Sequence, residues 1–278
     1  ILIMLSQILF AAFAATAAAS SGFLEETSNS TICDSVKQYS GYYKLTTGAK
    51  NYFYWAFESR NAPSTDPVVL WMTGGPGCSS EVALFGENGP CKVNADGTDT
   101  LPNQYSWNNN ATVIYIDQPA GTGFSWGSGM DHDEVGVAND MYDFLQQFMK
   151  AHPDLAARDF YAFGESYAGH YIPAVTHKIW QNNNALPSGA IKINLKGTSV
   201  GNGLTDPEVQ YQYYKDMAAS TNDHSPLSNA TIAGMTKATP GCIKAIQGCE
   251  TGGSVACPCH RILQPWLVDS VHVYWDEP

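Results

Sequence analysis

The stretch "FYAFGESYAGHYIPA", Phe160–Ala174, is the part of this sequence that most directly indicates a fold. An aromatic run stops at Gly164, a serine follows two residues later, and small residues then lead into a helical pattern. Strand, sharp glycine turn, serine and helix form the layout of a nucleophile elbow, which lifts a serine hydroxyl above a sheet. Ser166 is therefore a candidate nucleophile, and the backbone N–H of Tyr167 a candidate donor to a developing oxyanion. An ordinary turn whose serine caps the following helix explains the same letters equally well.

A second motif favours the catalytic interpretation. The segment "TGGPGCSS", Thr73–Ser80, directly follows the apolar run "VVLWM". Consecutive glycines let backbone N–H groups approach a ligand closely, because no Cβ stands in the way. Folds with a nucleophile elbow place their second oxyanion donor in a loop of this kind. A phosphate-binding loop is the rival interpretation, but its closing lysine and hydroxyl residue are missing.

Strand and helix patterns alternate along the chain and predict an α/β fold. Continuous apolar runs, typical of strands buried on both faces, occur in "PVVLWM", "ATVIYI", "DFYAF" and "IKINLKGTSVG". The turn "TTGAK" between two aromatic runs predicts a hairpin. Apolar residues at helical spacing from Val137 to Phe148 predict a helix that stops at His152-Pro153, and "YIPAVTHKIWQ" predicts another.

The composition is apolar and acidic. The chain has 278 residues, of which 44% are hydrophobic and 14% charged, and its formal net charge is -12. These apolar side chains suffice for one large core, although the length also allows two domains. An acidic surface repels phosphate backbones, so nucleic acid is not expected as a partner.

The first residues predict entry into the secretory pathway. Residues 1–20 resemble the core and cleavage region of a signal peptide that lacks its usual start. A transmembrane anchor is the alternative, because Ile1–Ala19 is nearly long enough to span a bilayer. Secretory entry predicts a secreted or vacuolar/lysosomal protein, with disulfides and with no membrane attachment once the leader is removed. Sequons at Asn29, Asn110 and Asn229 fit this route.

Four motifs together resemble those of the serine carboxypeptidases, particularly the carboxypeptidase Y type: "WMTGGPGCSS", "YIDQPAGTGFSW", "GESYAGHYIPA" and "GNGLTDP". The resemblance implies an α/β-hydrolase fold, with a mostly parallel central sheet flanked by helices and a disulfide-bonded helical insertion. On this basis, residues 21–206 are expected to be the N-terminal part of the hydrolase core. Residues 207–278 are expected to be a truncated insertion, or cap, and the last strands are expected to be missing.

The resemblance also implies roles for individual residues. Ser166 would be the nucleophile, and the N–H groups of Gly75 and Tyr167 would form the oxyanion hole. The terminal carboxylate of the substrate would be held by Trp71, Thr73, the N–H of Gly74, Glu87 and Glu165. Thr73 departs from the family, which normally has asparagine there, and a hydroxyl has one donor where an amide has two. The implied partner is the C-terminus of a peptide or protein, with no cofactor or metal and an open oligomeric state.

Two acids can bind a third acid only if a proton is shared among them. Crowding Glu87, Glu165 and the substrate carboxylate together should raise the pKa of the two acids. A protonated carboxyl then donates a hydrogen bond to the substrate anion, so binding should be tighter at acidic pH. Without the resemblance, Glu87 would be interpreted as a solvated loop acid.

A serine nucleophile also needs a histidine base and an acid that orients this base. No histidine after Ser166 stands in a family context for the base: His170, His177, His224, His260 and His272. The base and the orienting acid are therefore expected beyond the end of the chain. This predicts a fragment that is inactive alone and that exposes an edge of its sheet.

The seven cysteines fit the same interpretation. A Cys33–Cys91 disulfide is possible, and the late cysteines could pair locally: Cys242, Cys249, Cys257 and Cys259. The family pairs Cys78 with a later partner, so Cys78 is expected to be free here. A zinc site is the rival interpretation for Cys249, Cys257, Cys259 and His260.

Three functions remain open from the sequence. The leading hypothesis is a serine-type carboxypeptidase that removes C-terminal residues through an acyl-enzyme on Ser166. An acyltransferase on the same scaffold is the variant, but glutamate rather than aspartate before the serine favours the peptidase. A natively short, non-catalytic product that binds peptides is the alternative from another class.

Overall fold

The structure is a computed structural model, and it describes residues 23–28, 32–220 and 227–252. Only the backbone is described for Phe23–Ser28 and for residues 249–252. The expected signal peptide, the sequon at Asn29 and the rival zinc site therefore lie outside the described side chains. Three of the histidines named above do so as well: His224, His260 and His272.

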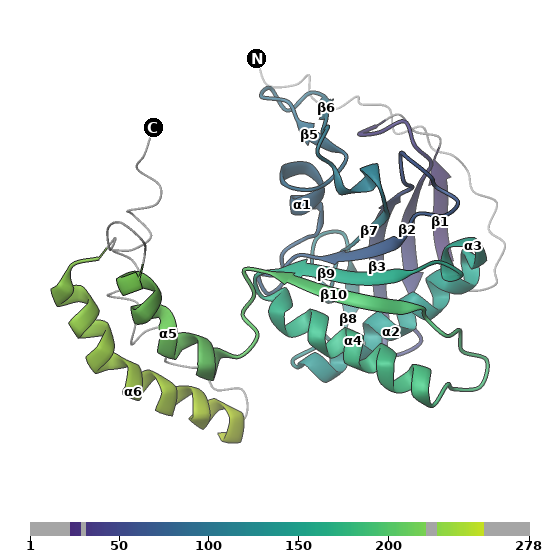
Figure 1. Cartoon of the computed structure of the whole chain (residues 1–278). Coiled ribbons are helices and arrows are strands. Elements are labelled where there is room, and N and C mark those ends of the chain that lie inside the picture. The colour runs from purple at the N-terminus through teal and green to yellow at the C-terminus, as the bar shows by residue number, and fades with distance from the viewer. Residues whose placement is uncertain (1–22, 29–31, 221–226, 253–278) are drawn as a thin grey trace, which may run out of the picture.

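One large mixed sheet organises the described chain (Figure 1). Its strands, in spatial order, are β1 (Phe23–Ser28), β2 (Gln38–Lys44), β3 (Ala49–Phe57), β7 (Thr112–Ile116), β4 (Val68–Met72), β9 (Phe160–Glu165) and β10 (Leu195–Gly201), with β8 (Trp126–Ser128) paired to β3. The strands β1, β2, β3 and β7 pair antiparallel, whereas β7, β4, β9 and β10 run parallel. A separate short hairpin joins β5 (Cys91–Val93) to β6 (Thr100–Pro102). This is the mostly parallel α/β sheet that the sequence predicts.

Helices cover both faces of the sheet (Figure 1). The helices are α1 (Glu81–Gly86), the 3-10 turn η1 (Trp107–Asn109), α2 (Glu134–Ala151), α3 (Pro153–Ala156), α4 (Ala168–Asn184), α5 (Pro207–Ser220) and α6 (Asn229–Gly252). The larger core cluster joins one face of the sheet to α2 and α4, and the smaller one joins the other face to α1. Helices α5 and α6 pack on each other beside the sheet, where the sequence predicts an excursion. None of the described helices is both long and apolar enough to cross a bilayer.

The predicted elements form where their patterns place them, with one difference. Strands β4 and β7 are buried along their whole length, and α2 ends at Ala151, directly before His152-Pro153. The strand expected over "IKINLKGTSVG" begins only at Leu195. The reason is that the side chain of Gln146 binds the N–H and C=O of Ile191, at 2.7 and 2.8 Å. Asn183 binds the backbone of Ile193 in the same way, so these backbone groups have helix side chains as partners instead of a strand.

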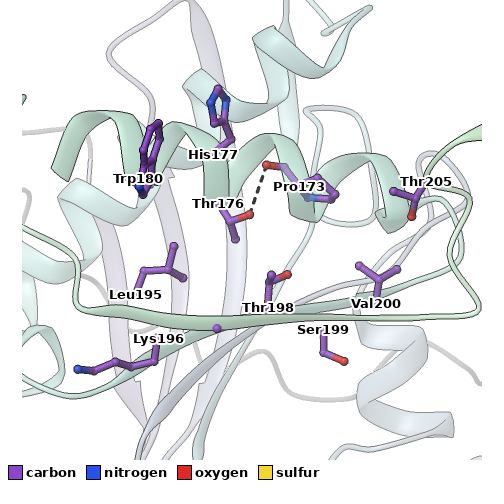
Figure 2. Close-up of a pocket in the computed structure, with 11 residues that line it drawn as sticks. Pro173, Thr176, His177, Trp180, Leu195, Lys196, Thr198, Ser199, Val200 and Thr205 are labelled. Carbon is purple, nitrogen blue, oxygen red and sulfur yellow. Dashed lines mark hydrogen bonds between the residues drawn. The ribbon is translucent and has the colours of Figure 1, made fainter. Parts of the chain in front are cut away.

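Strand β10 forms one edge of the sheet in the described part of the chain. A groove of about 550 Å³ runs between this edge and α4 (Figure 2). Trp180 and His177 of α4, whose rings stack at 5.7 Å, line it together with Leu195, Thr198 and Val200. The open edge agrees with the expectation from the sequence, and the groove contains none of the predicted site residues.

Leu70 lies in the middle of the sheet, and its replacement should be costly. It is fully buried, pairs with Ile114 of β7 and with Ala162 of β9, and belongs to the larger core cluster. We expect Leu70→Ala to lower the free energy of unfolding by about 2–5 kcal/mol, because a cavity remains. The matched control is Val93→Ala, where the side chain is 50% exposed. Equal losses in urea denaturation of both variants would contradict this arrangement.

Candidate active site

Ser166 sits in a sharp turn between β9 and α4. Its φ is 60°, in the left-handed region that non-glycine residues rarely adopt, and the residue is exposed. Gly164 is buried beneath the turn, and a Cβ there would lie 2.6 Å from both the Ala168 Cβ and the Met72 carbonyl oxygen. The Ser166 N–H donates to the Gly201 carbonyl oxygen at 3.0 Å, which fixes the turn to β10. This is the geometry of a nucleophile elbow, and it explains why a glycine precedes the serine by two residues.

The glycine loop, Thr73–Ser80, packs directly against the elbow. A Cβ on Gly74 would lie 2.3 Å from the Tyr167 nitrogen and 2.7 Å from the Glu165 carbonyl oxygen, so only glycine fits. Gly75 has a φ of +113°, which also requires glycine. Within the described residues, no carbonyl accepts a hydrogen bond from the N–H of Gly75 or of Tyr167. The structure thus brings together the two segments whose N–H groups are predicted to bind an oxyanion.

Glu87 and Glu165 meet beside the elbow. Glu165 lies close enough to Glu87 to act on its ionisation, although the two acids reach this point from different elements. Desolvation, and then the interaction with Glu165, raise the pKa of Glu87 to about 7. Glu87 therefore retains its proton under mildly acidic conditions, and a protonated carboxyl can donate a hydrogen bond to an anion.

Polar contacts hold Glu87 in place at the end of α1. The side-chain amide of Asn103 donates to the carbonyl oxygens of Glu87 and Gly89, at 3.4 and 2.9 Å. A few residues later, Cys91 forms a disulfide with Cys33, which confirms the pairing considered possible from the sequence. Glu87 itself is exposed, as its sequence context suggests, but the segment that carries it is held by these contacts.

Trp71 contacts Thr73 within the protein. The Trp71 indole N–H donates to the Thr73 hydroxyl oxygen at 3.0 Å, and the Trp71 ring packs edge-on against Trp107 at 5.2 Å. The Thr73 hydroxyl keeps its own hydrogen as a donor because the indole uses only its oxygen. Any contact of the Trp71 N–H with a substrate would have to compete with this bond. The assignment of Thr73 as a carboxylate ligand stays a prediction.

One neighbour of the elbow, Glu134, was not identified from the sequence, whereas His170 was expected in the helix that follows. The Tyr167 hydroxyl donates to Glu134 at the start of α2, at 3.0 Å. The Tyr167 ring stacks on His170, with 4.6 Å between ring centroids, and the His170 Nδ1 is buried without a hydrogen-bond partner. Glu134 directly follows Asp133, which caps α2. This sequence context indicates the start of a helix, but it does not indicate the contact of Glu134 with Tyr167. In the described residues, no histidine hydrogen-bonds to the Ser166 hydroxyl.

The structure also describes the surroundings of two predicted glycosylation sites and two of the cysteines. Asn110 and Asn229 are exposed, as a glycosylation acceptor must be. Cys78 is a free, exposed thiol, as expected, and Cys242 is disulfide-bonded. No group of three or more metal-ligating side chains occurs in the part of the chain that the structure describes.

The mixed sheet, the elbow and the glycine loop define an α/β-hydrolase. Comparisons with known proteins narrow this class. The sequence profile of the family described as serine carboxypeptidase matches residues 29–269. A serine carboxypeptidase-like protein of Oryza sativa subsp. japonica is 45% identical over 235 residues, covering 83% of this chain and 53% of the relative. Carboxypeptidase Y homolog A of Fusarium vanettenii is 45% identical over 226 residues, covering 81% and 41%.

A solved structure agrees with these relatives. Kex1Δp, a prohormone-processing carboxypeptidase from Saccharomyces cerevisiae, superposes with a TM-score of 0.70 and 28% identity, covering 84% of this chain and 53% of that chain. The chain therefore belongs to the serine carboxypeptidase family, as its motifs indicate. It spans about half the length of the relatives it matches.

The left-handed backbone of Ser166 predicts an unusual order of stability between two variants that lack the serine hydroxyl. Glycine adopts φ of 60° freely, whereas alanine retains the Cβ clash. We expect Ser166→Gly to be more stable than Ser166→Ala by about 1 kcal/mol, measured by urea denaturation. If the alanine variant is the more stable one, the turn does not carry the strain described here.

Proposed function

We propose that the protein containing this chain is a serine-type carboxypeptidase that removes C-terminal residues from peptides, with Ser166 as nucleophile. The observation that carries this proposal is the exposed Ser166, which lies against the glycine loop and directly follows Glu165, the acid that acts on Glu87. A chain end bound by the acids would present its last peptide bond to the serine. A substrate without a free carboxylate would make no such contact with this pair.

The reaction would proceed in two steps. The Ser166 oxygen bonds to the carbonyl carbon of the last peptide bond, and the negative charge on the carbonyl oxygen is stabilised by the N–H groups of Gly75 and Tyr167. The C–N bond then breaks, the leaving amine takes a proton, and water releases the peptide from the serine. We propose that the histidine base and its orienting acid come from the part of the longer relatives that this chain does not match.

A secretory location is also part of the proposal. The Cys33–Cys91 disulfide supports it, because such bonds persist in oxidising compartments. The exposed positions of Asn110 and Asn229 are compatible with glycosylation. Secreted and vacuolar or lysosomal destinations fit these observations equally.

Ser166→Ala in the full-length protein tests the reaction directly. We expect the release of C-terminal residues to fall by a factor on the order of 10³ or more, because no nucleophile remains. Binding of the same peptide should be nearly unchanged, since the alanine variant keeps the carboxylate-binding groups. Added alcohol acceptors in this assay distinguish a hydrolase from an acyltransferase. Peptide release by the variant at the parent rate would reject Ser166 as the nucleophile.

The acid pair predicts a defined pH dependence of binding. Glu87 has its pKa raised to about 7, so it is protonated and can donate to a peptide carboxylate below this pH, and it loses the proton above. Affinity for a peptide acid should therefore fall as pH rises through about 7. In Glu165→Gln this fall should flatten, because the amide donates at every pH and no longer raises the pKa of Glu87.

The measurement is the Kd of a short peptide acid between pH 5 and pH 9, by titration calorimetry on the Ser166→Ala background. The C-terminal amide of the same peptide is the ligand control, and Asp96→Asn, an exposed acid in the β5–β6 turn, is the variant control. An identical pH profile for parent and Glu165→Gln would show that the two acids do not share a proton.

A further inference from the structure

A second pair of acids lies beneath the glycine loop, apart from Glu87 and Glu165. Glu81 is the first residue of α1 and is 8% exposed, whereas Asp117 directly follows β7 and is fully buried. Buried carboxyl groups are costly unless they are hydrogen-bonded or neutral. Nothing in the proposed reaction uses this pair, so its role needs a separate explanation.

Asp117 is held by backbone hydrogen bonds to both of its carboxyl oxygens. Its Oδ1 accepts the N–H of Ser80 at 3.0 Å, and its Oδ2 accepts the N–H of Phe124 at 2.7 Å. Gly123 lies against it so closely that a Cβ would stand 2.0 Å from Oδ2. The Asp117 carboxylate thus has two backbone donors, one for each oxygen, and these bonds hold two loops against it.

Glu81 has the surroundings of a neutral acid. Its Oε2 accepts the Ser79 hydroxyl, while its Oε1 is buried and has no hydrogen bond of good geometry. Asp117 lies close enough to act on the Glu81 carboxyl, and no described cation is among the groups that do so. Burial, followed by the interaction with Asp117, raises the pKa of Glu81 to about 8. Tyr42 of β2 also faces this pair, and burial and the two acids raise its pKa.

The pair is linked by two hydrogen bonds to the predicted substrate site. Thr73 donates its N–H to the Ser80 hydroxyl at 3.2 Å, and Ser80 donates its own N–H to Asp117. Ser80 is 1% exposed, so water does not readily replace these bonds. Both ends of the glycine loop are thereby tied to Asp117, and through Phe124 the same carboxylate holds the loop that follows β7.

We propose that Glu81 and Asp117 are positioning residues that share one proton and thereby hold the glycine loop against the loop after β7. When Glu81 ionises, two buried negative charges face each other with no cation between them, and the contact loosens. The consequence for substrate binding rests on the proposed function, because the glycine loop carries Thr73, Gly74 and Gly75. The consequence for the fold itself does not.

The sign of the effect on stability follows from linkage. In the unfolded chain Glu81 ionises near pH 4.5, whereas in the folded protein it keeps its proton until about pH 8. Its contribution to the free energy of unfolding is therefore fully present below pH 4.5 and is lost as pH rises through about 8. Alkaline pH should weaken the fold at the glycine loop first.

The test compares parent, Glu81→Gln and the control Asp96→Asn. Glutamine keeps a donor for Asp117 but cannot ionise, so the fall in Tm between pH 5 and pH 9 should shrink by several degrees in Glu81→Gln alone. Because Glu87 titrates in an overlapping range, each variant is also made with Glu87→Gln, which removes that contribution.

Hydrogen exchange provides the local readout. Corrected for its intrinsic pH dependence, exchange at the Ser80 and Phe124 amides should speed up above pH 8 in the parent and stay constant in Glu81→Gln.

Carboxyl NMR of the parent protein measures the Glu81 titration directly, even if the variant folds poorly. A Glu81 that titrates near pH 4.5 in the folded protein, or equal pH profiles in parent and Glu81→Gln, would overturn the proposal. These readouts need no substrate. A failure of peptide binding or turnover would therefore count against the proposed function while leaving this inference intact.

Discussion

The predicted site depends on the close approach of two backbone segments. Gly74 lies so near the elbow that any side chain on it would collide with the Tyr167 nitrogen, and Ser166 adopts a left-handed backbone to complete the turn. Each feature is unfavourable or impossible for most residues, and neither is useful without the other. Together they place two segments with uncommitted N–H groups beside one exposed hydroxyl. The parallel strands β4 and β9 make this contact possible, because their carboxyl ends meet at the same edge of the sheet.

The protein manages its buried acids in two different ways. On the α2 side of the sheet, Lys50 lies between Asp131 and Asp140, with contacts of 2.7 and 2.6 Å, although burial and Asp140 still raise the pKa of Asp131. Around the glycine loop, acids face other acids, and a shared proton replaces the cation. In the first arrangement a cation remains between the acids, because Asp131 and Asp140 keep the pKa of Lys50 raised. The second has no cation, so its stability depends directly on a retained proton.

The sequence predicted the elements whose patterns are local. Val68–Met72 and Thr112–Ile116 are unbroken apolar runs, and they form the fully buried strands β4 and β7. The elbow could be predicted for the same reason, since Gly164 and Ser166 are close in sequence. The delayed start of β10 could not, because it results from Gln146, a residue distant in the chain. The pairing of Glu81 with Asp117 was also missed, since neither residue lies in a motif that reports its partner. The resemblance supplied roles for Glu87 and Trp71 that their own surroundings in the sequence do not indicate.

The Cys33–Cys91 disulfide gives the chain an uneven unfolded state. It closes a ring with a sequence separation of 58, which contains β2, β3, β4, the glycine loop and Glu87, whereas Ser166 lies outside it. Constraining a ring of this size removes unfolded-state entropy equivalent to about 4 kcal/mol. In an oxidised chain, Trp71, Thr73, Gly74 and Glu87 thus stay on one covalent ring even after denaturation, whereas Glu165 lies outside it with Ser166. On refolding, the elbow then packs against segments that the disulfide already keeps close together. In a reduced chain, these segments must first come together without that constraint.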